Sequence, residues 1–161
     1  MTVGGMVGRT RARNYYTKVA YSDMATIGVE FSSAKLSVDG ILVKLQIWDI
    51  SSQDRYKNMT STFYRGACAI TLWFSVERES DSYQSITKHF FPRMQEVAPG
   101  VPVILVGNKI DLRGEGYQCY TTEEGWKLAK QINAVTYLEC SALTGEGVAN
   151  VFEAAARVGL W

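Results

Sequence analysis

Proline, histidine and cysteine are scarce in this 161-residue chain, which contains three prolines, one histidine and three cysteines. With His89 as the single histidine, the sequence offers too few ligands for a His/Cys metal site. Cys68, Cys119 and Cys140 are an odd number at spacings that match no disulfide or zinc framework, and Cys68 and Cys140 lie in apolar runs. We therefore interpret all three as reduced thiols of a cytoplasmic protein.

An excess of charge of one sign and long apolar runs are also absent. Lysine and arginine total 17, aspartate and glutamate total 16, and both signs are interspersed, so the charge pattern favours neither nucleic acid nor a polybasic membrane contact. No apolar stretch approaches the roughly 20 residues of a membrane span, and the N-terminus lacks the apolar region of a secretory signal. We expect a cytoplasmic protein with no nucleic-acid partner and no membrane anchor in this sequence.

Strand and helix patterns alternate along the sequence. Two segments joined at Asp39-Gly40 predict an antiparallel hairpin, at residues 31–38 and 42–49. Three further apolar runs predict buried parallel strands, at residues 67–74, 101–107 and 136–140. Helices are predicted between and after them, at residues 80–97, 121–132 and 146–158. This order predicts a single α/β domain over residues 1–161, with a doubly wound, mostly parallel sheet, helices on both faces and ligand loops at the strand C-termini.

Three motifs on those loops indicate nucleotide chemistry. WDISSQDRY at residues 48–56 puts a carboxylate at a strand end and a glutamine four residues later, which suits γ-phosphate chemistry. NKID at residues 108–111 places an amide, an ammonium stem and a carboxylate on one loop. That trio suits guanine, because the carboxylate accepts from N1 and the exocyclic amine while the lysine stem packs along the base. ECSAL at residues 139–143 offers backbone amides to a purine carbonyl.

These motifs, in this order, resemble the Ras superfamily of small GTPases over nearly the whole chain. In the front half, TIGVEF, VKLQIWD and STFYRGA are similar to segments of Rab proteins. In the back half, FSV at residues 74–76, DLR at residues 111–113 and ECSALTGEGVANVFEAA are similar to Rho proteins, although the extra Rho helix is absent. The resemblance implies the fold of a small-GTPase G domain and a Rab-like or unclassified member.

The N-terminal segment, VGGMVGRT, matches the family's phosphate loop only in part. Val3 stands where the pattern has its first glycine, Arg9 where it has lysine, and only Gly8 and Thr10 fit. A planar guanidinium in place of an ammonium displaces the positive charge from the phosphate, which would weaken nucleotide binding by about 1.5–3 kcal/mol. The alternative is a flexible, glycine-rich N-terminus. The resemblance assigns nucleotide binding in this segment to Gly5, Val7, Gly8, Arg9 and Thr10.

The strand that precedes this loop in the family is nearly missing, because only Met1-Thr2-Val3 stand before it. Residues 11–22 stand where the family has an apolar helix, and they have only a partial apolar face. We therefore expect a truncated first strand, with residues 1–4 forming at most a short remnant in the centre of the sheet. The five other strands are expected to be full, and the chain to be only marginally stable alone.

The two switch segments keep some family residues and lose others. The resemblance assigns Mg²⁺ binding to Thr10, Thr26 and Asp49, and the orientation of the attacking water to Gln53. The resemblance also assigns a nucleotide contact to Ser52, which stands where the family has a glycine whose amide meets the γ-phosphate. A serine side chain restricts the backbone freedom that this hinge position uses. The alternatives are a strand-edge residue for Thr26, a turn residue for Asp49 and an exposed loop residue for Gln53.

The remaining assignments are contacts to the base and to partner proteins. The resemblance implies guanine binding by two loops, through Asn108, Lys109, Asp111, Ser141, Ala142 and Leu143. Three aromatic residues match the triad at the effector face of Rab proteins, namely Phe31, Trp48 and Phe63. Ordinary core packing is an equal alternative for these three, because aromatic residues serve both cores and interfaces.

The implied function is a GTP/GDP-dependent switch in vesicle traffic or signalling, with slow GTP hydrolysis by in-line water attack. Mg²⁺ is the implied cofactor, and guanine nucleotide and effector and regulatory proteins are the implied partners. The alternative is a pseudo-GTPase that serves as a protein-interaction module with little or no nucleotide binding or turnover. A third interpretation is an incomplete version of an active protein, whose fuller chain would be recruited to membranes by a lipidated tail.

Overall fold

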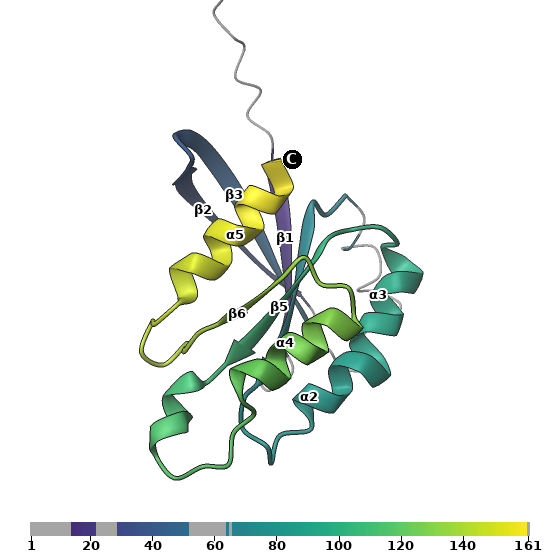
Figure 1. Ribbon diagram of the computed structural model, residues 1–161. Helices are drawn as coiled ribbons and strands as arrows, with labels where there is room; N and C mark the ends of the chain where they lie inside the picture. Colours follow the sequence, from purple (N-terminus) through teal and green to yellow (C-terminus); the bar gives the residue numbers. More distant parts are fainter. Residues whose placement is uncertain (1–13, 22–28, 52–63, 65, 161) are drawn as a thin grey trace, which may run out of the picture.

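The computed structural model describes residues 14–21, 29–51, 64 and 66–160 (Figure 1). Within these residues the strands form a six-stranded sheet in the order β2-β3-β1-β4-β5-β6. Their bounds are β1 (Asn14–Tyr21), β2 (Val29–Val38), β3 (Ile41–Ser51), β4 (Ala69–Ser75), β5 (Val103–Asn108) and β6 (Thr136–Glu139). β2 and β3 are antiparallel and the other neighbouring pairs are parallel, which confirms the predicted α/β class.

The predicted hairpin is formed by β2 and β3, which meet at the pair Val38 and Ile41. Asp39 has a φ of 50° and Gly40 a φ of 78°, and positive φ at both central positions is what a type I′ hairpin turn requires. The turn is also tied to the last helix, α5 (Val148–Leu160), because Arg157 donates to the Asp39 carboxylate at 2.8 Å.

The helices occupy the connections between parallel strands. The helix predicted at residues 80–97 forms as three consecutive pieces, α2 (Ser82–Ser85), the π-helical turn η3 (Ile86–Phe90) and α3 (Phe91–Val97). A 3₁₀ turn, η4 (Ile110–Gly114), follows β5. The predicted capping box opens α4 (Thr122–Gln131): the Glu124 amide donates to the Thr121 hydroxyl at 3.2 Å, and the Thr121 amide donates to the Glu124 carboxylate at 2.8 Å.

The centre of the sheet corrects one expectation. The gap that we expected between β3 and β4 is filled by β1, which pairs along its whole length with β3 and from Thr17 to Ala20 with β4. β1 comes from the segment that stands where the family has an apolar helix, and we had predicted no strand there. Two facing strand edges would otherwise leave backbone groups without partners, and a segment rich in tyrosine, threonine and valine favours a strand. We expected marginal stability because the central strand was missing, and β1 removes that reason. Residues 1–4, predicted to form a short strand remnant, lie outside the described residues.

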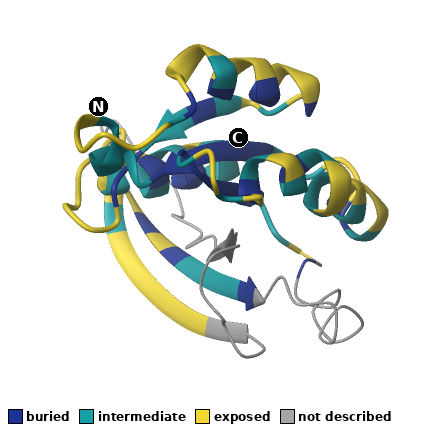
Figure 2. Ribbon diagram, turned by 90° about the horizontal axis from the view of Figure 1, so that it is seen from below, coloured by how far each residue is buried: buried dark blue, intermediate teal, exposed yellow. Residues whose placement is uncertain are grey.

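The core lies on both faces of the sheet, as the strand period of two residues dictates. On one face Ile70, Leu72 and Phe74 of β4 pack with side chains of η3, α3 and α4, namely Ile86, Met94 and Leu128. On the other face Trp73 packs with Val151 and Ala155 of α5. Figure 2 shows the contrast between the buried strands β4 and β5 and the strand β2, whose residues 31–35 are exposed. Helices therefore cover the two faces of the sheet, and the loops at the C-terminal ends of the strands lie at its edge, where a site can form.

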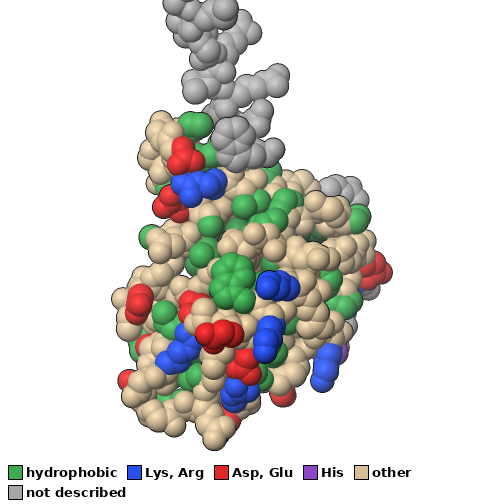
Figure 3. Space-filling model, viewed as in Figure 1, with side chains coloured by type: hydrophobic (Ala, Val, Ile, Leu, Met, Phe, Trp, Pro, Cys, Tyr) green, Lys and Arg blue, Asp and Glu red, His purple; other side chains and the backbone are tan. Residues whose placement is uncertain are grey.

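The surface matches the balanced composition. Figure 3 shows acidic and basic side chains intermingled on one face of the molecule, with no broad area of a single sign. Cys140 is fully buried and its burial raises the pKa of the thiol to about 11, while Cys68 and Cys119 are half-buried. Among the described residues, no helix is both long enough and apolar enough to cross a membrane.

Candidate functional site

Two loops predicted to bind the base meet at the same edge of the sheet. β5 ends at Asn108 and β6 ends at Glu139, and because the two strands are parallel neighbours their C-terminal loops emerge side by side. The backbone joins the loops directly: the Ile110 amide donates to the Cys140 carbonyl at 3.3 Å, and the Cys140 amide donates to Gly107 at 2.9 Å. The sheet therefore fixes the distance between the NKID and ECSAL motifs.

Asn108 is almost fully buried and connects the first loop to the second. Its Oδ1 atom accepts a hydrogen bond from the Ala142 amide at 3.0 Å, and the Cys140 thiol lies 3.7 Å from the same atom. A buried amide that bonds the backbone of another loop limits how that loop can move. In this structure the first residue of NKID therefore acts as a brace between the loops.

Asp111 and Ser141 form the second connection. The Ser141 hydroxyl, fully buried, donates to Oδ1 of Asp111 and accepts from the Thr144 amide at 3.1 Å. A carboxylate has about four acceptor sites, so this contact leaves Asp111 able to accept from donors on a ligand. Asp111 is half-buried, which places its carboxylate at the surface of the site rather than inside the core.

Lys109 turns the chain between these two residues. It adopts the left-handed conformation, with φ 66° and ψ 36°, which is uncommon for a side chain larger than asparagine. Its Nζ atom lies 3.8 Å from the Glu77 carboxylate. At the tip of the second loop, Leu143 is 84% exposed. The structure thus brings Asn108, Lys109, Asp111 and residues 141–143 to the same edge of the sheet.

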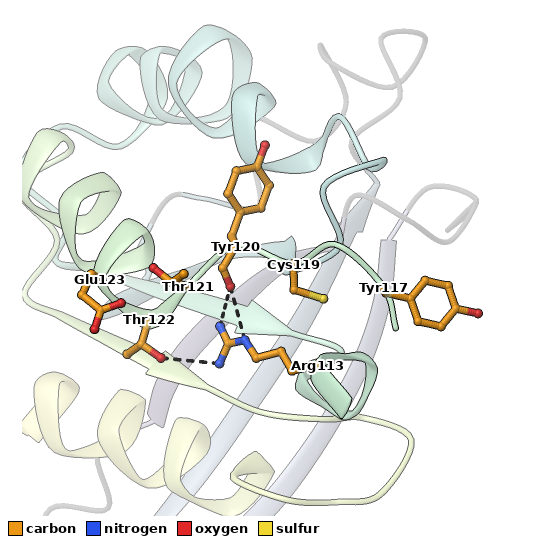
Figure 4. A pocket seen from close by; sticks show the side chains of 7 residues that line it. All are labelled: Arg113, Tyr117, Cys119, Tyr120, Thr121, Thr122 and Glu123. Atoms are coloured by element: carbon orange, nitrogen blue, oxygen red, sulfur yellow. Dashed lines mark hydrogen bonds between the residues drawn. The ribbon is translucent and has the colours of Figure 1, made fainter. Parts of the chain in front are cut away.

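Behind the two loops lies an ion pair that the sequence interpretation did not assign to the site. Arg113 of η4 donates to both carboxylate oxygens of Glu139, each at 2.7 Å. The guanidinium also donates to the Tyr120 carbonyl and the Thr122 hydroxyl, as Figure 4 shows. Both residues stand in segments that the sequence analysis singled out, since Arg113 ends DLR and Glu139 begins ECSAL, but neither segment alone indicates the contact.

The groove in Figure 4 lies beside the paired loops and shares Arg113 with them. It has a volume of about 370 Å³ and is lined by Arg113 and by residues between Tyr117 and Glu123. It does not include Asn108, Asp111 or Ser141. We therefore do not assign the base to this groove.

The carboxylate of Glu139 has a perturbed pKa. Burial raises this pKa, but hydrogen bonds from Arg113, Tyr137 and Thr122 and the charge of Arg113 outweigh burial, so it lies below its ordinary value of 4.5. Burial and the hydrogen bond to Glu139 raise the pKa of Tyr137. At neutral pH the pair is therefore an ionised carboxylate that accepts from a protonated phenol.

This shift predicts a pH dependence of stability. A group whose pKa is lower in the folded chain stabilises the fold above its unfolded pKa, and the contribution is lost as the pH falls through the folded pKa. We expect the melting temperature of the wild type to fall more steeply below about pH 4.5 than that of Glu139→Gln. Thermal melts of both proteins between about pH 7 and 3 measure the difference. Parallel curves would contradict the prediction.

The phosphate and catalytic positions lie outside the described residues. These are Gly5, Val7, Gly8, Arg9, Thr10, Thr26, Ser52 and Gln53, together with the aromatic Phe63. Of the predicted aromatic triad, Phe31 and Trp48 are paired across β2 and β3 with ring centroids 4.8 Å apart. Phe31 is 53% exposed, whereas Trp48 packs against the core. Trp48 therefore fits the alternative of core packing, whereas the exposed Phe31 fits the alternative of a surface that contacts partner proteins.

Asp49 is the one predicted Mg²⁺ residue that the structure describes. It is half-buried near the C-terminal end of β3, opposite Val19 of the parallel strand β1. A carboxylate oxygen suits a hard cation such as Mg²⁺. The described residues contain no group of three or more histidine, cysteine or acidic side chains that could bind a metal. Within the described part of the chain, Asp49 is therefore the one predicted Mg²⁺ ligand whose position can be stated, a carboxylate near a strand end.

One comparison with known proteins bears on this arrangement. A model of the Ras family matches residues 2–159, which is nearly the whole chain. The match includes both paired loops and the sheet that positions them.

Proposed function

The chain belongs to the Ras family, and from this premise we propose that it is a Rab-like GTP/GDP-dependent switch in vesicle traffic or signalling. The observation that carries the proposal is the pairing of the NKID and ECSAL loops through Asn108–Ala142 and Asp111–Ser141. This pairing places a carboxylate and a set of backbone amides at one edge of the sheet. Both are needed to recognise guanine.

The choice of guanine follows from donors and acceptors. Guanine carries two adjacent donors, N1–H and the 2-amino group, that a carboxylate can accept, and it carries an oxygen on carbon 6 that a backbone amide can meet. Adenine presents an acceptor at N1 and a donor at carbon 6. Opposite Asp111, adenine would leave a partly buried charge without donors, which is costly. We therefore assign the base to Asp111 and to the tip of the second loop, where the Leu143 amide is the proposed donor because the Ala142 amide already donates to Asn108.

The phosphate chemistry is proposed from the family pattern. Arg9 and the amides of Gly5, Val7 and Gly8 would contact the phosphates, and Gln53 would orient water in line with the γ-phosphate. Thr10, Thr26 and Asp49 would hold Mg²⁺, which when bound neutralises charge on the β- and γ-phosphates. Arg9 in place of lysine and Ser52 in place of glycine favour slow hydrolysis.

The second candidate is a pseudo-GTPase that binds partner proteins without nucleotide turnover. Two observations favour it: the phosphate-loop pattern is incomplete, and the Phe31 ring stands exposed beside Trp48. An exposed aromatic side chain is a typical interface anchor. In both candidates we propose effector and regulatory partners at this face and a cytoplasmic location, with membrane recruitment if a fuller chain carries a lipidated tail.

Bound nucleotide decides between the two candidates. We expect purified protein, denatured and analysed by chromatography, to release about one guanine nucleotide per chain. We expect fluorescent GDP to be displaced by GDP and not by ADP. Protein that contains no guanine nucleotide and takes up no fluorescent GDP would favour the interaction module. Equal displacement by ADP and GDP would remove the assignment of guanine.

A further inference from the structure

We propose that Arg113 and Glu139 are positioning residues that set guanine affinity and base discrimination by keeping the two base-binding loops in register. This role rests on the proposed function. Neither residue is assigned to contact with the base. Each lies close in sequence to residues that are. Arg113 stands two residues after Asp111, and Glu139 stands two residues before Ser141. The ion pair therefore closes a short ring through both loops.

The ring has two sides. On the ligand side, the Ser141 hydroxyl donates to Asp111. On the far side, Nη1 and Nη2 of Arg113 donate to Oε2 and Oε1 of Glu139, each at 2.7 Å. A bidentate pair fixes orientation as well as distance, which a lysine at position 113 would not do. Rotation of one loop against the other would have to break one of these sides.

Both charged groups of the bridge are saturated with partners. Besides the two arginine donors, the Glu139 carboxylate accepts from the Tyr137 hydroxyl at 2.6 Å and the Thr122 hydroxyl at 3.1 Å. Arg113 uses its remaining donors on the Tyr120 carbonyl, at 2.9 and 3.3 Å, and on the Thr122 hydroxyl, at 3.5 Å. Side-chain exposure is 28% for Arg113 and 19% for Glu139, so water competes only weakly. The bridge is therefore better placed to hold a geometry than an ordinary surface pair.

Tyr137 anchors the bridge to the core. Its ring lies between Gly107 of β5 and Gly125 of α4, because a Cβ at either glycine would meet the Tyr137 side chain. The ring also stacks on Phe74 and meets Trp126 edge to face. With the ring fixed, its hydroxyl presents a fixed donor to Glu139. The position of the second loop is thus set from the core through Tyr137 and Glu139.

The consequence for binding is selective. A displacement of about 1 Å between Asp111 and the second loop can cost about a hundredfold at a site that needs several aligned contacts. Guanine makes two contacts to Asp111, through N1–H and the 2-amino group, whereas hypoxanthine lacks the 2-amino group. Misplacement of Asp111 should therefore weaken GDP binding more than binding of inosine diphosphate. A general loss of stability would weaken both alike.

The first experiment reads the loop geometry without any ligand. Amide hydrogen exchange at Ala142, whose N–H donates to Asn108, is measured in nucleotide-free wild type, Glu139→Gln and Tyr137→Phe. We expect exchange at Ala142 to be faster by about tenfold in Glu139→Gln and by less in Tyr137→Phe, which keeps the ring. The matched control is Arg157→Met, which removes another arginine bridge, to Asp39 and Glu153, at the opposite end of the sheet from these loops. Unchanged exchange at Ala142 in Glu139→Gln overturns the proposal.

The second experiment reads base discrimination. Dissociation of fluorescent GDP is followed in wild type, Arg113→Met, Glu139→Gln and the double variant, with GDP and inosine diphosphate as competitors. We expect each single variant to release GDP about tenfold faster and to lose most of its preference for GDP over inosine diphosphate, and the double variant to be no worse than the weaker single. An unchanged preference overturns the proposal. If the wild type binds no guanine nucleotide, both the proposed function and this positioning role are wrong. If the wild type binds GDP and the variants release GDP and discriminate against inosine diphosphate as the wild type does, only the positioning role is wrong.

Discussion

Asp111→Asn is expected to lose GDP affinity by about a hundredfold and to prefer xanthosine diphosphate. An amide can accept only one of the two guanine donors and turns a donor of its own toward the other, which removes about 3 kcal/mol of charge-assisted hydrogen bonding. Xanthine has a carbonyl oxygen at carbon 2, which an amide N–H can meet. The amide oxygen can still accept from Ser141, so the loop pairing survives. Titration with fluorescent GDP and competing xanthosine diphosphate measures the change.

The control for this variant is Asp81→Asn. Asp81 is an exposed aspartate at the start of α2 whose side chain makes no capping hydrogen bond. The charge change is the same, and Asp81 belongs to neither base-binding loop. Asp81→Asn should bind GDP as the wild type does. If Asp111→Asn also binds GDP unchanged, the carboxylate does not contact the base.

Gly147→Ala is expected to cost about 3–5 kcal/mol of folding free energy, the largest stability effect we predict. Gly147 has a φ of 71°, and a Cβ there would run into the Glu139 carbonyl oxygen and contact Cys140. The neighbouring atoms are backbone at the start of the ECSAL loop, so they cannot move aside as a flexible side chain could. Urea denaturation measures the loss, and fluorescent GDP measures the expected damage to the second loop.

Gly145→Ala separates backbone strain from the steric clash. Gly145 lies in the same loop with a φ of 81°, but a Cβ there would meet nothing within 4 Å. Its substitution should therefore cost only the left-handed strain, about 1–2 kcal/mol. Equal losses in the two variants would show that the close approach of Gly147 to Glu139 does not matter in solution.

The sequence by itself determined the parts of this protein that are encoded locally. The hairpin turn at Asp39-Gly40, the capping box at Thr121 and the apolar strand predicted at residues 101–107 each depend on a few adjacent residues. The turn and the capping box form where they were predicted, and the strand forms within two residues of its predicted bounds, at Val103–Asn108. The two loops that we propose bind the base could also be placed together, because loops that follow parallel neighbouring strands emerge at the same edge of the sheet. The family is shown by a match over residues 2–159.

The tertiary structure decided what depends on partners distant in the chain. Asn14–Tyr21 has only a partial apolar face as a helix, and its place as the central strand became apparent only once β3 and β4 presented facing edges that needed backbone partners. Arg113 and Glu139 are 26 residues apart, and nothing in either motif alone shows that their side chains meet. Strand propensity and hydrogen-bonding capacity belong to single residues, whereas the choice among competing partners is made by the whole fold, because only assembly determines which polar groups would otherwise be buried unpaired.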